Sequence, residues 1–115
     1  MNYTTKDSGK KIKFKTGAVR NSQTEKLRYD LIPTHALKRI AGLYMRGASI
    51  YGERNWEKGL TFSNLVASLE RHLNQFKQGD KDEDHLAACA WNVLALLHFQ
   101  EVGREEELND LPKYK

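Results

Sequence analysis

Residues 63–103, SNLVASLERHLNQFKQGDKDEDHLAACAWNVLALLHFQEVG, decide the fold, because they hold two helical apolar patterns on either side of a short polar link. In the first half, apolar side chains recur every three or four residues and form one stripe. These residues are Leu65, Val66, Leu69, Leu73 and Phe76. We expect a helix that begins near Ser63, a residue type favoured at the N-cap, and ends at Gly79.

The second half predicts a helix that is apolar around much of its circumference. It begins in the acidic run 80–84, whose carboxylates suit the positive end of a helix dipole, and stops by Gly103. Its apolar residues are Leu86, Ala87, Cys89, Ala90, Val93, Leu94 and Leu97. A helix of this kind belongs at the centre of a bundle.

A third helix is expected earlier in the chain, starting near Pro33, because proline is favoured in a first helical turn. Its apolar stripe is Ala36, Leu37, Ile40, Ala41, Leu43 and Tyr44. We expect it to stop at Gly47 and to be followed by a structured loop over 48–59 with room for one helical turn. Residues 104–109 predict a short final helix. No segment shows a convincing strand pattern, although 12–15 alternate as a short extended piece would.

These elements predict an all-α protein, a small bundle of three main helices with an irregular basic N-terminal segment. A chain of 115 residues buries only a limited core, so we expect the bundle to be completed by oligomerisation. The expected organisation is a poorly ordered or lid-like lead-in over 1–25, a helical domain over 26–103 and a charged tail over 104–115.

The net charge of +4 is concentrated in the lead-in. Its basic residues are Lys6, Lys10, Lys11, Lys13, Lys15 and Arg20. Such an arm can attract nucleic acid or small polyphosphates, or it can be a solvated tail. Without interleaved aromatics or a DNA-reading motif, we favour a tail or lid over a nucleic-acid partner. The single cysteine fits a reducing compartment, and no apolar run approaches the length of a membrane span.

Polar side chains gather around the link between the two central helices. Asn92 follows His85 by seven residues, so both lie on one face of their helix. Antiparallel packing brings the two sides of the link together, which offers oxygen and nitrogen ligands to a divalent cation. These ligands are Glu70, His72, Asp82, Asp84 and His85. The alternative is a solvated helix start that complements the dipole and holds no ion; spacing alone leaves both open.

The loop over 52–59 is a second polar cluster. Asn55 and Trp56 can hold a base by hydrogen bonding and stacking, while Arg54 and Lys58 can meet phosphate. Arg28, which precedes the first helix, can join them. The alternative is a surface loop in which Trp56 plugs one end of the bundle and the charges face water.

Several sequence blocks occur together in a fixed order. They are 16–20, 28–33, 47–48, 51–56, 71–73, 84–88 and 91–92, or TGAVR, RYDLIP, GA, YGERNW, RHL, DHLAA and WN. Over residues 16–97 the chain resembles the dATP/dGTP diphosphohydrolase domain common in phages and prophages. That family is similar to the all-α, MazG-like nucleotide pyrophosphohydrolases, which are usually oligomeric helical bundles that hold magnesium on acidic residues of two neighbouring helices.

This chain departs from the MazG-like acidic signature, which has Glu-x-x-Glu on one helix and Glu-x-x-Asp on the next. The nearest counterpart of the second element is Asp82-x-x-His85, followed by Asn92. The first element is reduced to Glu70 beside His72.

The resemblance implies that a metal-activated water attacks the α-phosphate of a purine (deoxy)nucleoside triphosphate, releasing monophosphate and pyrophosphate. It implies Mg²⁺ or Mn²⁺ as cofactor, a homo-oligomer, and the cytoplasm of a bacterial host or phage-infected cell. The residues implied are Glu70, His72 and His85 for catalysis, Glu70, Asp82, Asp84 and His85 for the metal, and Arg28, Glu53, Asn55, Trp56, Lys58 and Asn92 for the substrate. The alternative is a protein that sequesters a nucleotide or cyclic nucleotide without cleaving it.

Overall fold

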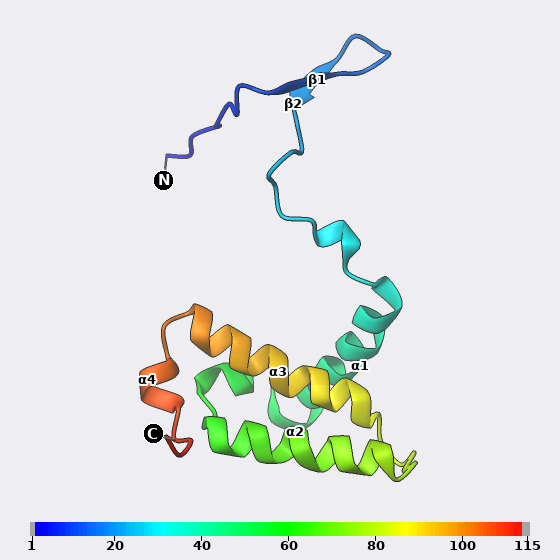
Figure 1. Cartoon of the computed structure of the whole chain (residues 1–115), viewed down its shortest axis with the longest axis vertical. Helices are drawn as coiled ribbons and strands as arrows, with labels where there is room; N and C mark the ends of the chain where they lie inside the picture. The colour runs from blue at the N-terminus through cyan, green and yellow to red at the C-terminus, as the bar shows by residue number, and fades with distance from the viewer. Residues whose placement is uncertain (1, 114–115) are drawn as a thin grey trace. The chain divides into compact units, whose positions relative to one another are not determined.

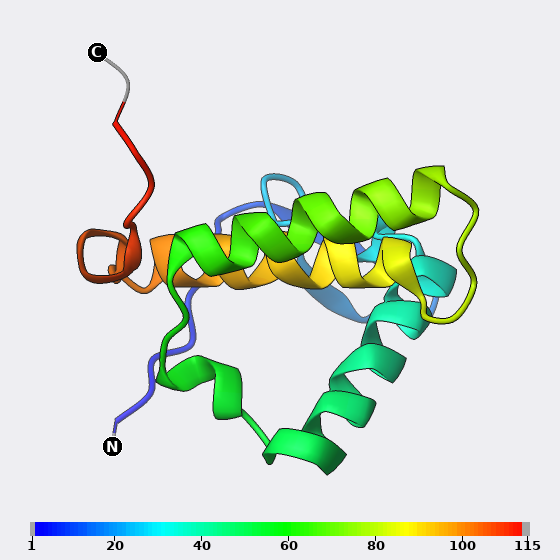
Figure 2. The same ribbon diagram turned by 90° about the horizontal axis from the view of Figure 1, so that it is seen from below.

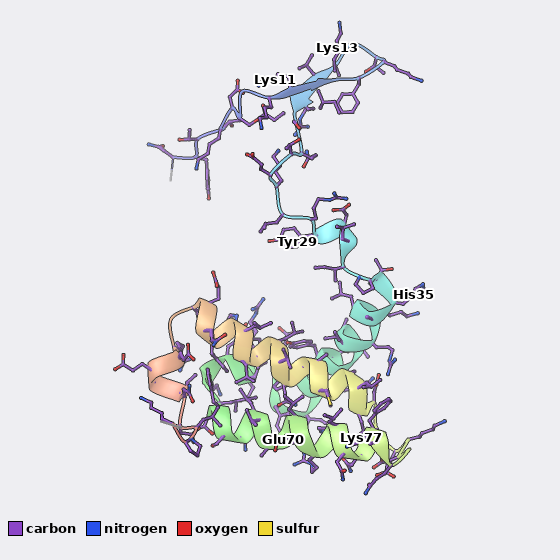
Figure 3. All side chains as sticks on the ribbon, in the orientation of Figure 1. Lys11, Lys13, Tyr29, His35, Glu70 and Lys77 are labelled. Atoms are coloured by element: carbon purple, nitrogen blue, oxygen red, sulfur yellow. The ribbon has the colours of Figure 1, made fainter. Side chains whose placement is uncertain are left out.

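The computed structural model describes residues 2–113 and divides into two compact units between Ile32 and Pro33. The first unit holds a hairpin of strands β1 (Lys11–Lys13) and β2 (Val19–Asn21), followed by the 3₁₀ turn η1 (Tyr29–Leu31). The strands are antiparallel, with Ile12 opposite Arg20. Figure 3 labels Lys11 and Lys13 on β1.

The hairpin corrects the expectation that the chain has no strand pairing. The extended piece expected near Ile12 is confirmed for β1, but its partner β2 was missed. The reason is that every residue of β1 is exposed and β2 is at most half-buried, so no buried face imposes an apolar–polar alternation. The turn closes at Gly17, whose φ of 94° is accessible to glycine at little cost.

The second unit contains the three main helices, which confirms the all-α prediction. Its elements are α1 (Thr34–Tyr51), η2 (Asn55–Lys58), α2 (Phe62–Lys77), α3 (His85–Glu101) and α4 (Glu105–Leu108). Figures 1 and 2 both show α2 and α3 side by side along most of their lengths. Since α3 contacts α1, α2 and α4, it is the central helix, as predicted. Its buried apolar residues are Ala87, Ala88, Ala95 and Phe99, whereas the expected Leu86, Val93, Leu94 and Leu97 are 37–55% exposed.

Two helix ends differ from the predicted ones. Helix α1 runs through Gly47 and ends at Gly52, whose N–H donates to Ala48 O and whose φ is 96°. An interior glycine costs only about 1 kcal/mol relative to alanine, so Gly47 is tolerated rather than a stop. Helix α2 is N-capped at Thr61 rather than Ser63. The Asp110 carboxylate instead accepts bonds from the Ser63 N–H at 2.8 Å and from the Ser63 hydroxyl at 2.6 Å.

The buried core joins α2 and α3 to the C-terminal segment. It consists of Phe62, Leu65, Ala95, Phe99 and Leu108. Because Leu108 is only 8% exposed, the segment expected to be a charged tail contributes directly to this core. The boundary expected at residue 103 therefore does not separate the tail from the bundle.

Arg104 links η2 to this core by two hydrogen bonds. Its guanidinium donates to Glu57 O at 2.8 Å and to Lys58 O at 2.9 Å. Gly59, at φ 123°, follows directly, and a Cβ there would lie 2.7 Å from Arg104 Nη2. Glycine is therefore needed for both the backbone conformation and the close approach of the arginine.

Helix α1 is the least covered of the three main helices, since none of its residues is buried. Of its predicted stripe, Leu37 is 49% exposed, while Leu43 and Tyr44 are half-buried. Ile50 and Tyr51 at its end are each 71% exposed. In the described part of the chain, no helix is both long and apolar enough to cross a membrane.

Candidate active site

A groove of about 710 Å³ lies in the second unit, between the C-terminal half of α1, η2, α2, the α2–α3 link and α3. In Figure 2, the ribbons of α1 and η2 diverge from the α2–α3 pair. Side chains from all four of these elements line the groove. Its aromatic and polar lining residues are Tyr44, Arg46, Tyr51, Arg54, Asn55, Trp56, Asn64, Ser68, His72, Asp82, Glu83, Asp84, Trp91 and Asn92.

Three aromatic side chains meet at one part of the groove. The ring centroids of Tyr44 and Trp91 are 5.9 Å apart, and those of Trp56 and Trp91 are 6.1 Å apart in an edge-on arrangement. Trp56 is held from behind by Phe99, with centroids 5.8 Å apart. Burial raises the pKa of the Tyr44 hydroxyl, which keeps it neutral. Such rings suit the flat face of a nucleobase.

Two buried histidines form the polar centre of the site. His72 Nδ1 lies 2.9 Å from His85 Nδ1, and His85 Nε2 lies 2.8 Å from Asp82 Oδ1. Burial, and then the charge of Arg71, lowers the pKa of His72, so this ring is neutral at pH 7. The hydrogen bond from His85 lowers the pKa of Asp82, which is therefore a carboxylate that can only accept.

The charge of Asp82 fixes the direction of one of these hydrogen bonds. His85 donates through Nε2 to the Asp82 carboxylate, and one proton lies between the Nδ1 atoms of His72 and His85. The pair arises because the first turn of α3 packs against the third turn of α2 after the short link. Two imidazoles in a buried position can accept a proton from a reacting water or bind a metal ion.

Asn92 is the third buried polar residue, at 4% exposure. Its amide nitrogen donates to Ala88 O at 2.8 Å and to Ser68 Oγ at 3.3 Å. Both N–H groups are thus used within the protein. The amide oxygen has no hydrogen-bond partner within residues 2–113, so it is available as an acceptor for a ligand in the groove.

The Asp84 carboxylate is bound to two groups of the protein. Its carboxylate caps α3 by accepting from the Ala87 N–H at 3.2 Å, and it accepts from Arg39 Nε at 3.0 Å. The Arg39 guanidinium lowers the pKa of this carboxyl group. The prediction that the acidic run starts α3 is confirmed, with Asp84 as its N-cap.

Two sets of three side chains within the described residues bring donor atoms within 4.8 Å of one another. One set is His72, Glu83 and His85, and the other is Asp80, Asp82 and His85. Each includes at least one imidazole nitrogen, whereas Mg²⁺ takes oxygen ligands in a near-ideal octahedron. These donors therefore do not fit the Mg²⁺ implied by the MazG-like resemblance; they suit a transition-metal ion.

The structure brings most of the expected site residues into one groove. Those that line it are Asn55, Trp56, His72, Asp82, Asp84 and Asn92. His85 joins them through its hydrogen bonds to His72 and Asp82.

Three expected residues of the second unit do not line this groove, and a fourth belongs to the first unit. Glu70, labelled in Figure 3, is exposed and belongs to neither donor set, because two helical residues place it about 200° around α2 from His72. Glu53 and Lys58 are exposed and do not line the groove. Arg28 belongs to the first unit, where its guanidinium pairs with Asp30 at 2.8 Å.

Sequence reasoning did not single out several groove residues as site residues. They are Tyr44, Arg46, Asn64, Ser68, Glu83 and Trp91. Tyr44 and Arg46 lie on α1, and only the crossing of α1 over α3 turns them toward the site, which periodicity does not reveal. Trp91 had a usable signal, since it adjoins Asn92 on a helix otherwise rich in small residues.

Fold and site together define a small all-α domain with a polar and aromatic ligand groove. The family model described as dATP/dGTP diphosphohydrolase, N-terminal, matches residues 16–109, so the chain belongs to this family. The family carries the name of an enzyme class, the diphosphohydrolases, and the matched range includes every residue of the groove. No curated protein and no solved structure matches the chain.

Proposed function

We propose that the protein hydrolyses purine (deoxy)nucleoside triphosphates to the monophosphate and pyrophosphate. The observation that carries this proposal is that aromatic rings, arginines and a buried histidine–acid cluster share one groove of about 710 Å³. That volume lies within the range of about 300–1,000 Å³ typical of small-molecule sites. The family name supports the same substrate class.

The aromatic part of the groove suits the base. Trp56 and Trp91 offer ring faces and edges for stacking, and the free amide oxygen of Asn92 accepts from an N–H of a purine. Asn55, on η2, adds a further donor and acceptor along the groove. Buried hydrogen-bonding groups of this kind discriminate strongly against ligands that leave them unpaired.

The arginines suit the triphosphate. Arg46 and Arg54 line the groove, and their guanidinium groups offset phosphate charge. Arg54 is held by an ion pair with Glu57 at 2.7 Å. Arg28, Glu53 and Lys58 remain proposals as further substrate contacts.

The reaction is attack by water on the α-phosphorus. The new bond joins the water oxygen to this phosphorus, and the bond to the oxygen that bridges to the β-phosphorus breaks, so pyrophosphate leaves. Neutral His72 is suited to take the proton of the attacking water, and His85 is bonded to it through Nδ1. A divalent cation held by His72, His85 and Glu83 would supply positive charge to the phosphates. Asp82 holds the His85 ring in place by its hydrogen bond.

We infer that the protein associates with copies of itself. The support is α1, whose apolar side chains Leu37 and Met45 lie eight residues apart on one face and are 49% and 69% exposed. A second copy that packs on this helix would bury them and complete the small core. We place the activity in the cytoplasm of a bacterial host or phage-infected cell, where the single Cys89 stays a free thiol.

Sequestration of a nucleotide or cyclic nucleotide without cleavage is the second candidate. The observation that favours it is the small number of free carboxylates, since Asp84 is bound to Arg39 and Glu70 lies outside the groove. Such a protein would keep the aromatic and arginine contacts but lack turnover.

The test measures pyrophosphate release from dATP, dGTP, ATP and GTP, with Mg²⁺ or Mn²⁺ added and with chelator. The proposal predicts metal-dependent release from purine triphosphates, and loss of release in His85→Ala with the helical circular dichroism retained. Tight nucleotide binding with no release from any triphosphate would support sequestration and contradict hydrolysis.

A further inference from the structure

The two buried histidines pair through the nitrogens that a metal ion would use. His72 is 9% exposed and His85 is 3% exposed, and their Nδ1 atoms lie 2.9 Å apart. Two nitrogens bound to one ion at about 2.1 Å and a tetrahedral angle lie about 3.4 Å apart. A shift of a few tenths of an ångström, together with displacement of the proton between the two Nδ1 atoms, therefore converts this hydrogen bond into a pair of metal ligands.

Glu83 supplies a third donor from the α2–α3 link. Its carboxylate lies within 4.8 Å of a ring nitrogen of each histidine, and Glu83 is exposed and lines the groove. The three protein ligands are thus two nitrogens and one oxygen, with an open side toward the groove. Catalytic metal sites have this arrangement, and water or substrate takes the remaining position.

Asp82 is the second observation that points to a metal. Metal-ligating histidines almost always donate their other ring N–H to a carboxylate or carbonyl, which fixes the ring and leaves the ligating nitrogen unprotonated. His85 Nε2 makes this bond with Asp82 Oδ1 at 2.8 Å, and its Nδ1 is the nitrogen that faces His72. The carboxylate thus orients His85 from behind the site.

From these contacts we infer that His72, His85 and Glu83 form a transition-metal site, with Asp82 as the group that orients His85. Imidazole nitrogens suit Zn²⁺, Co²⁺, Ni²⁺ and Fe²⁺ and accept Mn²⁺, whereas Mg²⁺ selects oxygen. The site thus differs from the Mg²⁺ site on paired carboxylates that the sequence resemblance implies. Its role in turnover rests on the proposed function, but its binding of metal does not.

The test uses Co²⁺, whose visible absorption reports nitrogen ligation, added to the full-length, chelator-treated protein without nucleotide. We expect one Co²⁺ per chain, a visible spectrum that an excess of Mg²⁺ does not remove, and displacement by Zn²⁺. His72→Gln should weaken Co²⁺ binding by about tenfold or more, and Asp82→Asn by about tenfold, the usual range for an orienting partner.

Two further variants keep the test decisive if a histidine variant does not fold. Glu83→Gln changes an exposed side chain and should weaken binding without altering the circular dichroism. Asp80→Asn, the matched control from the other donor set, should leave binding unchanged. Binding that Asp80→Asn abolishes and Glu83→Gln does not, or a spectrum that Mg²⁺ displaces, would overturn the inference.

The outcomes also separate this site from the proposed function. If Co²⁺ binding is lost in His72→Gln and no pyrophosphate is released under any condition, the hydrolysis proposal is contradicted and the metal site is supported. If Glu83→Gln releases pyrophosphate in a metal-dependent way at the wild-type rate and its Co²⁺ affinity is unchanged, the metal site alone is contradicted.

Discussion

Helices α1 and α3 have nearly the same length, 18 and 17 residues, but opposite surroundings. Helix α3 has six buried residues, two of them the polar His85 and Asn92, whereas α1 has none. The difference shows that the two helices have different roles in this small domain. Helix α3 carries two of the three buried polar residues of the site, His85 and Asn92, and α1 supplies part of the groove lining together with exposed apolar side chains.

The largest expected effect comes from removing part of the core that holds α3. Phe99 is 0% exposed and packs between Phe62, Leu65 and Leu108, so Phe99→Ala should lower the free energy of unfolding by about 3–5 kcal/mol. Urea denaturation followed by circular dichroism measures the change. Leu97→Ala, at a 55% exposed position of the same helix, is the control and should cost far less. Equal losses in both variants would refute the assigned core.

The next effect is expected from a charge placed among the exposed apolar side chains of α1, which tests self-association. If a second copy covers this helix, Met45→Glu should weaken self-association by about 2 kcal/mol, or roughly thirtyfold in dissociation constant. Light scattering across a concentration series gives the mass of each variant. Met45→Leu preserves the apolar contact and should behave as wild type. A wild-type protein that is monomeric at every concentration would contradict the proposal.

A smaller effect is expected at Asn92. Asn92→Leu keeps the volume but removes the bonds to Ala88 O and Ser68, which should cost about 1 kcal/mol of stability. Loss of the amide oxygen should also raise the KM for purine triphosphates by about tenfold. Pyrophosphate assays and urea denaturation separate the two effects. Asn74→Leu, at an exposed position outside the groove, should change neither quantity.

The smallest effect is expected at the N-terminus of α2. The bonds from Ser63 lower the pKa of Asp110 below its ordinary value of 3.8. Because the unfolded chain binds this proton more readily, the stabilisation is complete above that value and disappears as pH falls through the lower folded pKa. Asp110→Ala should therefore lower the Tm modestly at pH 7 and not at strongly acid pH. Thermal scans with Glu106→Ala as control test this, and a pH-independent difference would contradict it.

The same comparison explains how much the sequence could predict. The positions of α2 and α3 could be predicted because α2 has a helical apolar stripe that includes Leu65. The central place of α3 could be predicted because that helix is apolar around much of its circumference. The end of α1 could not be predicted, because Gly47 is tolerated where no tight packing depends on it. The hairpin was missed because it buries no face.

The site could be predicted only where sequence neighbours are also spatial neighbours. His72, Asp82 and His85 flank one short link, so their contact follows from antiparallel packing. Glu70 was misleading because two residues along a helix turn a side chain to nearly the opposite face. Tyr44 reaches Trp91 only through the crossing of α1 over α3, a tertiary feature without a local pattern.

The central claim is that a purine triphosphate occupies the groove beside Trp56 and Trp91, the chain's two tryptophans. The direct measurement is a titration of ¹⁵N-labelled protein with a dATP analogue whose α,β-bridge is an imido group, followed through the two indole N–H resonances. The account predicts that both resonances shift together and saturably, and that dCTP shifts them less. Unmoved indoles, with shifts confined to the lysines of the hairpin, would contradict it.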